Sequence, residues 1–461
     1  MIKALKLISI ILLFVDFFKC KLLFVFEHFR HGARSPGFTV TETKYNHTDE
    51  YGIFWETNGE LTSIGIRTQY LIGVRNRKRY NTILSKKYDP REIIAFSTQM
   101  TRTIRSAQTQ LLGMYPPSGE EILNETEARF ALPPNGNKSE LSDEIEKLGN
   151  KVLPGGVQII PVYAIPEEEV HQLLSDIYFC PKLRTMKDKK QYDNKLMKFY
   201  HQFNSTFGKE LLHFFNKSNE SFYLYDFYRV FYLADVFLSD YDNQRDLSLI
   251  EKEGINLQKY YNISVEMKNL FLYYSECDEF ISSIAVSKTM RKILNWMEKR
   301  IECDIRNEKE LKYEEPKYVM YSGHDTTMAP FQLFMKKVFH TPLSYPHFSS
   351  TLYYELHYND SVHSKTKNEY YIKYYIDDTL MLTVPFSTFK KKVELLLWNK
   401  ERIDSFCSNS FLNNLSYIGL IGLLLIICII LIGIRCIHKK AKKGKKWKKG
   451  DNKEIGQELI S

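Results

Sequence analysis

Two arginines and a histidine occur together in the segment FRHGARSP, residues 29–36. Arg30 and Arg34 carry planar guanidinium groups, which hold phosphate oxygens in pairs and stay charged at any working pH. His31 places an imidazole group between them. Gly32 allows another backbone to approach closely. This pattern predicts a site for a doubly charged oxyanion.

Further polar residues follow two other apolar segments. Arg102 comes shortly after the run Ile93–Phe96, and His324 and Asp325 come just after Tyr318–Tyr321. These side chains would add a third guanidinium group, a cation or hydrogen-bond donor, and a carboxyl group that can transfer protons. We expect them to meet the first segment in one site.

The segments that lead into these residues are typical of buried strands. Leu22–Phe26, Ile93–Phe96 and Tyr318–Tyr321 are continuous apolar runs, which suit a parallel sheet covered on both faces. Open α/β sheets place their active sites at the carboxyl ends of such strands. Ser97 or Thr98 is expected to cap the helix that carries Arg102. The predicted fold class is α/β, with a mostly parallel sheet and helices on both faces.

The stretch 125–290 has a different character, with many Glu, Lys, Tyr and Phe residues and few strand signals. Helical spacing is found in Asp193–Phe203, Ser221–Leu238 and Ser282–Lys299, and strand-like segments return in Thr351–His357 and Glu369–Ile376. We therefore interpret 21–124 and 291–414 as two parts of one α/β core. Residues 125–290 form a smaller helical domain inserted between them.

Both ends of the chain carry membrane signals. Residues 1–20 have the order of a signal peptide, with cleavage expected after Cys20. Tyr417–Ile434 is a run of 18 residues without a charge. At about 1.5 Å per residue it almost spans a bilayer core, so we predict a transmembrane helix over 415–437. The Lys-rich tail, 438–461, is then cytoplasmic, which makes the chain a single-pass type I membrane protein.

The formal net charge of +9 comes from these ends. Residues 1–20 contribute +2 and residues 435–461 contribute +7, which leaves the region between them near neutrality. We expect no nucleic-acid partner, because the basic tail is a membrane-surface feature. The predicted location is the lysosome or the cell surface, with the main domain luminal or extracellular.

Cysteines and glycosylation motifs agree with a secreted domain. Cys180, Cys277, Cys303 and Cys407 are an even number between the two membrane signals, which indicates one or two disulfides. No CxxC pair is present, so no metal site is predicted. N-x-[ST] motifs also lie only in this region, and the candidate glycosylation sites are Asn46, Asn124, Asn137, Asn204, Asn216, Asn219, Asn262 and Asn359, with a further motif at Asn414.

These motifs resemble the histidine acid phosphatases, in particular the lysosomal and prostatic branch. The resemblance covers most of residues 21–400 and is carried by FRHGARSP, GELTSIGIRTQYLIG at 59–73, STQMTRTIRSA followed by YPP at 115–117, and YSGHDTT at 321–327. It implies a histidine phosphatase (phosphoglycerate mutase-like) fold with an inserted helical domain, and it suggests a homodimer.

The resemblance also implies a role for each site residue. His31 would be the nucleophile and Asp325 the proton donor, with Arg30, Arg34, Arg102 and His324 as phosphate ligands. A disulfide between Cys180 and Cys277 is implied as well, which would leave Cys303 with Cys407.

The implied reaction is the hydrolysis of phosphate monoesters without a metal or other cofactor. The imidazole attacks phosphorus, protonated Asp325 donates to the departing alcohol, and water then cleaves the phosphohistidine. Cationic groups offset the charge on the phosphate oxygens. An acidic optimum is expected, because the first step needs a protonated carboxyl group.

Three alternatives remain open. The same scaffold could hydrolyse inositol polyphosphates, as phytases do, although a near-neutral domain does not indicate the extra cations this requires. A metal hydrolase could use His28, His31, His324 and Asp325, but the nearby arginines would repel a cation. The chain could also be a catalytically silent, glycosylated type I receptor that keeps the fold.

Overall fold

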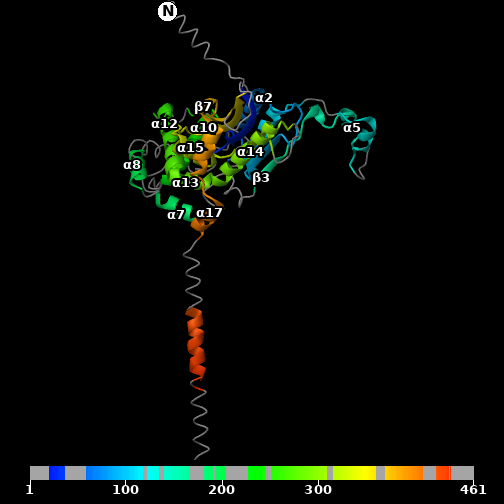
Figure 1. The fold of residues 1–461 in the computed structure, drawn as a ribbon. Coiled ribbons are helices and arrows are strands. Elements are labelled where there is room, and N and C mark those ends of the chain that lie inside the picture. The colour runs from blue at the N-terminus through cyan, green and yellow to red at the C-terminus, as the bar shows by residue number, and fades with distance from the viewer. Residues whose placement is uncertain are drawn as a thin grey trace, which may run out of the picture. The chain divides into compact units, whose positions relative to one another are not determined.

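The computed structural model describes residues 20–36, 59–117, 122–133, 140–165, 180–190, 193–203, 227–244, 247, 251–252, 254, 256–308, 315–359, 369–408, 422–435 and 437. The chain divides into two compact units, Met1–Asp404 and Ser405–Ser461. The first unit contains a seven-stranded sheet with helices packed against it (Figure 1).

The sheet is mixed. Its strands are β1 (Cys20–Arg30), β2 (Ile93–Thr98), β3 (Val162–Ile165), β4 (Tyr318–Gly323), β5 (Thr351–Asn359), β6 (Tyr370–Ile376) and β7 (Thr379–Pro385). They lie in the order β3-β2-β4-β1-β5-β6-β7, in which the first four are parallel and the last three antiparallel. The predicted mostly parallel sheet is therefore correct for one half only. Only two residues join β6 to β7, and so short a connection allows only an antiparallel pair.

The helices agree in part with their predicted bounds. They are α2 (Ser63–Arg79), α3 (Thr101–Met114), α4 (Glu125–Phe130), α5 (Ser142–Leu148), α7 (Pro181–Lys190), α8 (Asn194–Phe203), α10 (Phe227–Asp242), α12 (Leu257–Leu270), α13 (Glu279–Ala285), α14 (Ser287–Arg306), α15 (Asp325–Phe339), α16 (Phe386–Glu394) and α17 (Lys400–Cys407). Short helical turns occur at η2 (Pro154–Gly156) and η5 (Phe271–Glu276). The single helix predicted over Ser282–Lys299 is instead the end of α13 and most of α14. Met100 occupies the N-cap position of α3, whereas Ser97 and Thr98 remain in β2.

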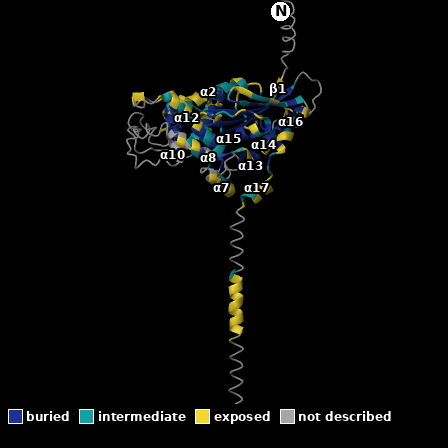
Figure 2. Cartoon of the chain, turned by 90° about the vertical axis from the view of Figure 1, so that its left-hand side faces the viewer, coloured by how far each residue is buried: buried dark blue, intermediate teal, exposed yellow. Residues whose placement is uncertain are grey.

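Both faces of the central strands β1 and β4 are buried, as their apolar runs predict, whereas the edge strand β7 is largely exposed (Figure 2). In β1, Phe24 and Phe26 face a core shared with α14 and α15. Val25 and Phe29 face a second core, which is shared with α3 and with Tyr80, the residue that ends α2. Because side chains alternate along a strand, a run that is apolar at every position supplies both cores.

One charged residue of β1 is buried in the second core. The Glu27 carboxylate accepts hydrogen bonds from the Tyr318 hydroxyl at 2.6 Å, the Gln110 amide at 2.6 Å and the Asn76 amide at 2.9 Å. Burial raises the pKa of Glu27 above its ordinary value, although these donors act in the opposite direction.

The predicted helical insertion has its own apolar cluster. Phe231, Phe237, Tyr260 and Phe271 pack together from α10, α12 and η5. The same stretch also supplies β3, which pairs with β2 at the edge of the sheet and was not predicted. The boundaries of this domain at 125 and 290 stay a prediction.

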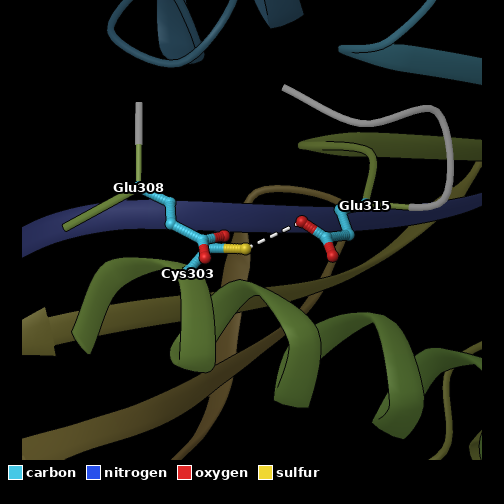
Figure 3. A group of neighbouring side chains, drawn as sticks. All are labelled: Cys303, Glu308 and Glu315. Atoms are coloured by element: carbon cyan, nitrogen blue, oxygen red, sulfur yellow. Dashed lines mark hydrogen bonds between the residues drawn. The ribbon is translucent and has the colours of Figure 1, made fainter. Parts of the chain in front are cut away.

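The implied disulfide pairs are wrong. Cys180 and Cys407 are disulfide-bonded, but Cys277 and Cys303 carry thiols. The Cys277 thiol donates to the Asp278 carbonyl oxygen at 3.5 Å. The Cys303 thiol donates to the Glu315 carboxylate at 2.8 Å (Figure 3). Spacing along the chain does not determine which sulfur atoms meet in space.

Among the described residues, no helix is both long and apolar enough to cross a membrane. Residues 422–435 are helical, and almost all of their side chains are exposed (Figure 2). Three predicted segments lie outside the described residues: the start of the membrane span at 415–421, the leader up to residue 19 and the tail 438–461.

Three of the glycosylation candidates lie in the described part of the chain. Asn124 and Asn262 are exposed, whereas Asn359 is half-buried at the end of β5. Asn46, Asn137, Asn204, Asn216, Asn219 and Asn414 lie outside the described residues.

Close backbone contact holds α2 against α3. A Cβ atom added at Gly73 would overlap the carbonyl oxygen of Gln110, and one added at Gly113 would lie 2.8 Å from the backbone nitrogen of Val74. Glycine is therefore required on both helices where they cross. Because α3 carries Arg102, this crossing also positions part of the candidate site.

We predict that Gly73→Ala lowers the free energy of unfolding by about 1–3 kcal/mol, because the methyl group forces the two helix backbones apart. The higher helix propensity of alanine offsets only about 1 kcal/mol of this cost. Thermal unfolding of the variant would measure it. Leu71→Ala, at an exposed position of the same helix, is the control and should change stability little. Equal effects of the two substitutions would contradict the close crossing.

Candidate active site

Strand register brings the candidate residues together. Arg30 in β1 pairs with Gly323 in β4, so the next residue of each strand, His31 and His324, leaves the sheet at the same level. The two imidazole rings lie with centroids 5.4 Å apart. Ser97 in β2 pairs with Ser322 in β4, which sets the start of α3 beside them. The predicted meeting of three strand ends is confirmed.

The loop after β1 is held by a second glycine contact. A Cβ atom on Gly32 would lie 2.6 Å from the carbonyl oxygen of Gly65 at the start of α2, and one on Gly65 would overlap the carbonyl oxygen of Ala33. The predicted close approach at Gly32 is therefore real, and the backbone that approaches belongs to α2. This packing fixes the loop that presents His31.

His31 is buried and has one defined tautomer. Its Nδ1 lies 2.8 Å from the Gly32 carbonyl oxygen, which can only accept a hydrogen bond. Nδ1 must therefore carry the proton, and the lone pair is on Nε2. Burial and the nearby charges of Arg102 and Arg30 hold the pKa of His31 well below its usual range. The ring is neutral, which is the state that a nucleophile needs.

Arg30 is fixed by three contacts. Its Nη1 donates to the Pro346 carbonyl oxygen at 2.9 Å, and its Nη2 pairs with the Asp325 carboxylate at 2.9 Å. The guanidinium group also lies over the Phe348 ring, 4.1 Å from its centroid. The same ring lies 5.6 Å from the His31 ring, so Phe348 supports both residues.

Arg34 is held by the helical region. Its Nη2 contacts both carboxylate oxygens of Asp235 in α10, at 2.9 and 3.2 Å, and its Nη1 donates to the Ser35 carbonyl oxygen at 2.9 Å. A carboxylate that bonds a guanidinium group with both oxygens fixes its orientation as well as its position.

Arg102 differs from the other two arginines. It is half-buried, and within the described part of the chain it makes no ion pair. Burial and the neighbouring charge of Arg34 lower its pKa to about 10. A guanidinium group without a carboxylate partner, beside two others, is available for an anion that enters the site.

His324 is neutral in the absence of a ligand. Its Nε2 lies 3.0 Å from the Thr98 hydroxyl. Burial and the charge of Arg102 lower its pKa to about 3. Of the two roles that the sequence allowed, this state favours a hydrogen-bonding group over a cation.

Asp325, the first residue of α15, is ionised. Its Oδ2 lies 2.9 Å from Arg30 Nη2 and 3.2 Å from Lys268 Nζ. Burial alone would raise its pKa, but the charges of Arg30 and Lys268 hold the pKa well below its usual range. The proton donor implied by the resemblance is thus a carboxylate as long as Arg30 and Lys268 are its partners.

Sequence reasoning missed Asp235, Lys268 and Phe348. Asp235 and Phe348 belong to no recognisable motif. Lys268 did leave a signal, because it lies four and eight residues after Ser264 and Tyr260 on the buried face of α12. A lysine on such a face is rarely buried unless it is paired.

The histidine and arginine cluster does not include His28, one of the ligands considered for a metal hydrolase. His28 lies in the first core, where its Nε2 contacts the Thr327 hydroxyl at 3.1 Å and its ring packs against Phe331. In the described residues, the one group of side chains with metal-ligand chemistry consists of Cys303, Glu308 and Glu315 (Figure 3). It shares no residue with the histidine and arginine cluster, and Glu308 already pairs with Arg306 at 3.1 Å.

The fold and the cluster together define a class of protein. An α/β sheet whose parallel strands end in a neutral histidine, three arginines and an acid has the parts of a histidine-based phosphatase. The family model "Histidine phosphatase superfamily (branch 2)" matches residues 21–377. The chain therefore belongs to this superfamily, which confirms the resemblance found in its motifs.

Individual relatives agree with this assignment. Human prostatic acid phosphatase is 25% identical over 374 residues, which cover 78% of each chain. Lysosomal acid phosphatase of Xenopus laevis is 31% identical over 163 residues, or 35% of this chain and 30% of that protein. The phytase of Hafnia alvei has the same fold, with a TM-score of 0.53 and 12% identity over 82% of this chain and 98% of that one.

We predict that Arg102→Gln weakens the binding of inorganic phosphate by about tenfold or more, since hydrogen bonds to charged groups contribute about 1.5–3 kcal/mol. Stability should hardly fall, because no buried carboxylate of the described residues loses its partner. Calorimetric titration and thermal unfolding would measure the two effects.

The control is Arg105→Gln. Arg105 lies on the same helix and pairs with half-buried Glu60 at 3.4 Å, so this substitution should leave phosphate affinity nearly unchanged. Arg34→Gln gives the contrast, because it strips Asp235 of its guanidinium partner and should lower both affinity and stability. If Arg102→Gln destabilised the chain as much as Arg34→Gln, the unpaired state of Arg102 would be refuted.

Proposed function

We propose that this protein hydrolyses phosphate monoesters through a phosphohistidine formed on Nε2 of His31. The observation that carries the proposal is the state of this imidazole: neutral, with its lone pair on Nε2, and surrounded by Arg30, Arg34 and Arg102. The acid phosphatase relatives are consistent with it.

In the first step, the substrate phosphate replaces Asp325 as the partner of Arg30 and binds Arg34, Arg102 and His324. The positive N-terminus of α15 adds to the attraction of this anion. Nε2 of His31 then forms a bond to phosphorus as the ester oxygen departs. The arginines offset the charge that the equatorial oxygens carry, which lowers the barrier without a metal.

Asp325 supplies the proton for the departing oxygen. It is ionised without a ligand, but a bound phosphate dianion takes over Arg30 and adds negative charge nearby, so both changes raise its pKa. Asp325 then takes up a proton in acidic solution and donates it. In the second step it accepts a proton from the water that attacks the phosphohistidine. An acidic optimum follows, because only there is Asp325 protonated in the complex.

A second candidate is the hydrolysis of inositol polyphosphates. The fold shared with phytases does not decide the substrate, because 12% identity carries the fold alone. Arg30, Arg34 and Lys268 are each already paired with a buried carboxylate. Of the cations in the site, Arg102 alone lacks such a partner in the described residues, which favours a substrate with a single phosphate.

We also propose that the domain faces the lumen or the outside of the cell, anchored by one membrane helix over 415–437. The uncharged run Tyr417–Ile434 and the Lys-rich tail support this topology. We further propose that the domain is glycosylated, that the protein resides in the lysosome or at the cell surface, and that it forms a homodimer.

His31→Ala should abolish phosphate release from an aryl phosphate, and rapid quenching of the unaltered protein with labelled substrate should trap a phosphoryl group on His31. Chelators should have no effect on the rate. His201→Ala, at an exposed helical position, is the control and should keep full activity.

Activity that is lost with a chelator would instead favour a metal hydrolase, and a complete absence of activity would favour a silent receptor. A higher catalytic efficiency on inositol hexakisphosphate than on simple monoesters would favour the second candidate. If rapid quenching with labelled substrate gives no phosphohistidine on His31, the proposed mechanism is wrong.

The anchor predicts that the full chain stays with membranes after alkaline carbonate extraction, whereas a chain that ends at residue 408 is released into the medium. Digestion with a glycosidase should increase the mobility of both forms. A full chain that is released by carbonate would contradict the membrane helix.

A further inference from the structure

Five buried charges of alternating sign connect the two arginines of the first motif through the helical region. Arg34 pairs with Asp235 at 2.9 Å, and Asp235 pairs with Lys268 at 3.0 Å. Lys268 pairs with Asp325 at 3.2 Å, and Asp325 pairs with Arg30 at 2.9 Å. We call this series the charge chain. Two of its three inner members, Asp235 and Lys268, have no role in the reaction as proposed above.

Lys268 is held from outside the phosphate site. Its Nζ contacts Asp235 on α10, and it lies 4.3 Å from the centroid of the Phe231 ring on the same helix. Its side chain is 4% exposed, so solvent does not compete for the ammonium group. In the proposed reaction the phosphate takes Arg30 from Asp325, whereas Lys268 contacts Asp325 from α12 and is not among the proposed phosphate ligands.

Charged and titratable groups surround Asp325 from every side. They are Arg30, His31 and Arg34 from β1 and its loop, Arg102 from α3, Asp235 from α10, Lys268 from α12, Tyr273 from η5, His324 beside it in the chain, and Tyr345. Bound phosphate offsets the arginines among these groups. Lys268 is then the cation that still bears directly on the carboxyl group.

We propose that Lys268, anchored by Asp235, is a positioning residue that sets how readily Asp325 gains and gives up the proton of the reaction. The inference rests on the proposed function. As the ester oxygen departs, the Asp325 O–H bond breaks, the proton moves to that oxygen, and the electron pair stays on the carboxylate. The ammonium group of Lys268, about 3 Å away, stabilises this new charge.

A stronger acid suits a poor leaving group. Alkyl phosphates need full protonation of the departing oxygen, whereas nitrophenyl phosphates need little. Lys268 therefore extends the substrate range toward alkyl esters and confines their hydrolysis to more acidic solution.

The test is the pH dependence of kcat for the full chain, measured with glycerol phosphate and with p-nitrophenyl phosphate. In Lys268→Met, Asp325 loses a neighbouring cation and keeps its proton to higher pH, so the basic limb of kcat should move up by roughly one pH unit. The rate on glycerol phosphate should fall several-fold more than the rate on p-nitrophenyl phosphate. Lys268→Arg keeps the charge and should stay near the original profile.

Asp235→Asn supplies a shift of opposite sign. Without this negative charge, the ammonium group of Lys268 pairs with Asp325 alone and lowers the pKa of Asp325. The basic limb should therefore move to lower pH. This variant also tests the inference if Lys268→Met does not fold. Lys259→Met, at an exposed position of α12, is the matched control and should leave both substrates and the pH profile unchanged.

Two results would overturn the role of Lys268. One is an equal loss of rate on both substrates in Lys268→Met, with the basic limb unmoved. The other is a basic limb that moves in the same direction in Lys268→Met and Asp235→Asn. In those cases, phosphate release that still depends on His31 leaves the proposed function intact. Activity that survives His31→Ala would overturn the function and this inference together.

Discussion

The structure depends on the concentration of three guanidinium groups around one buried, neutral imidazole. Like charges this close repel one another in a medium of low polarity, so the arrangement exists only because carboxylates from other parts of the chain intervene. Asp325 offsets Arg30 and Asp235 offsets Arg34, while Arg102 keeps its charge unpaired within the described residues. In the proposed reaction, the same balance allows Arg30 to exchange a carboxylate for a phosphate.

The sequence was sufficient to predict the family, the parallel half of the sheet and the meeting of the strand ends. Those predictions depend on local patterns: apolar runs buried on both faces, and polar residues directly after them. Strand register then brings the site residues together, because Arg30 pairs with Gly323 and the histidine that follows each of them leaves the sheet at the same level. The roles of these residues in the reaction stay predictions.

The remaining features depend on contacts between distant segments, which no local pattern contains. Asp235 and Lys268 reach the site only because α10 and α12 pack beside it. The cysteine pairs implied by the resemblance are wrong, because Cys277 and Cys303 carry thiols that donate hydrogen bonds to Asp278 and Glu315. The strands β5 and β6 were predicted, but their antiparallel pairing was not, and β3 and β7 were missed, because short strand signals do not reveal their partners.

The buried carboxyl groups also bear on how the fold responds to acid. Glu27 has a raised pKa, so its proton is bound more tightly in the folded chain than in the unfolded one, and the resulting stability is lost as pH rises through the folded-state value. Asp235 has the opposite shift, so its contribution is present above the pKa of an unfolded aspartate and is lost as pH falls from there toward the far lower folded-state value. Acidification therefore adds stability through Glu27 but removes it through the buried, neutral His31 and His324, because their lowered pKa values favour the unfolded chain once pH falls below the ordinary histidine value.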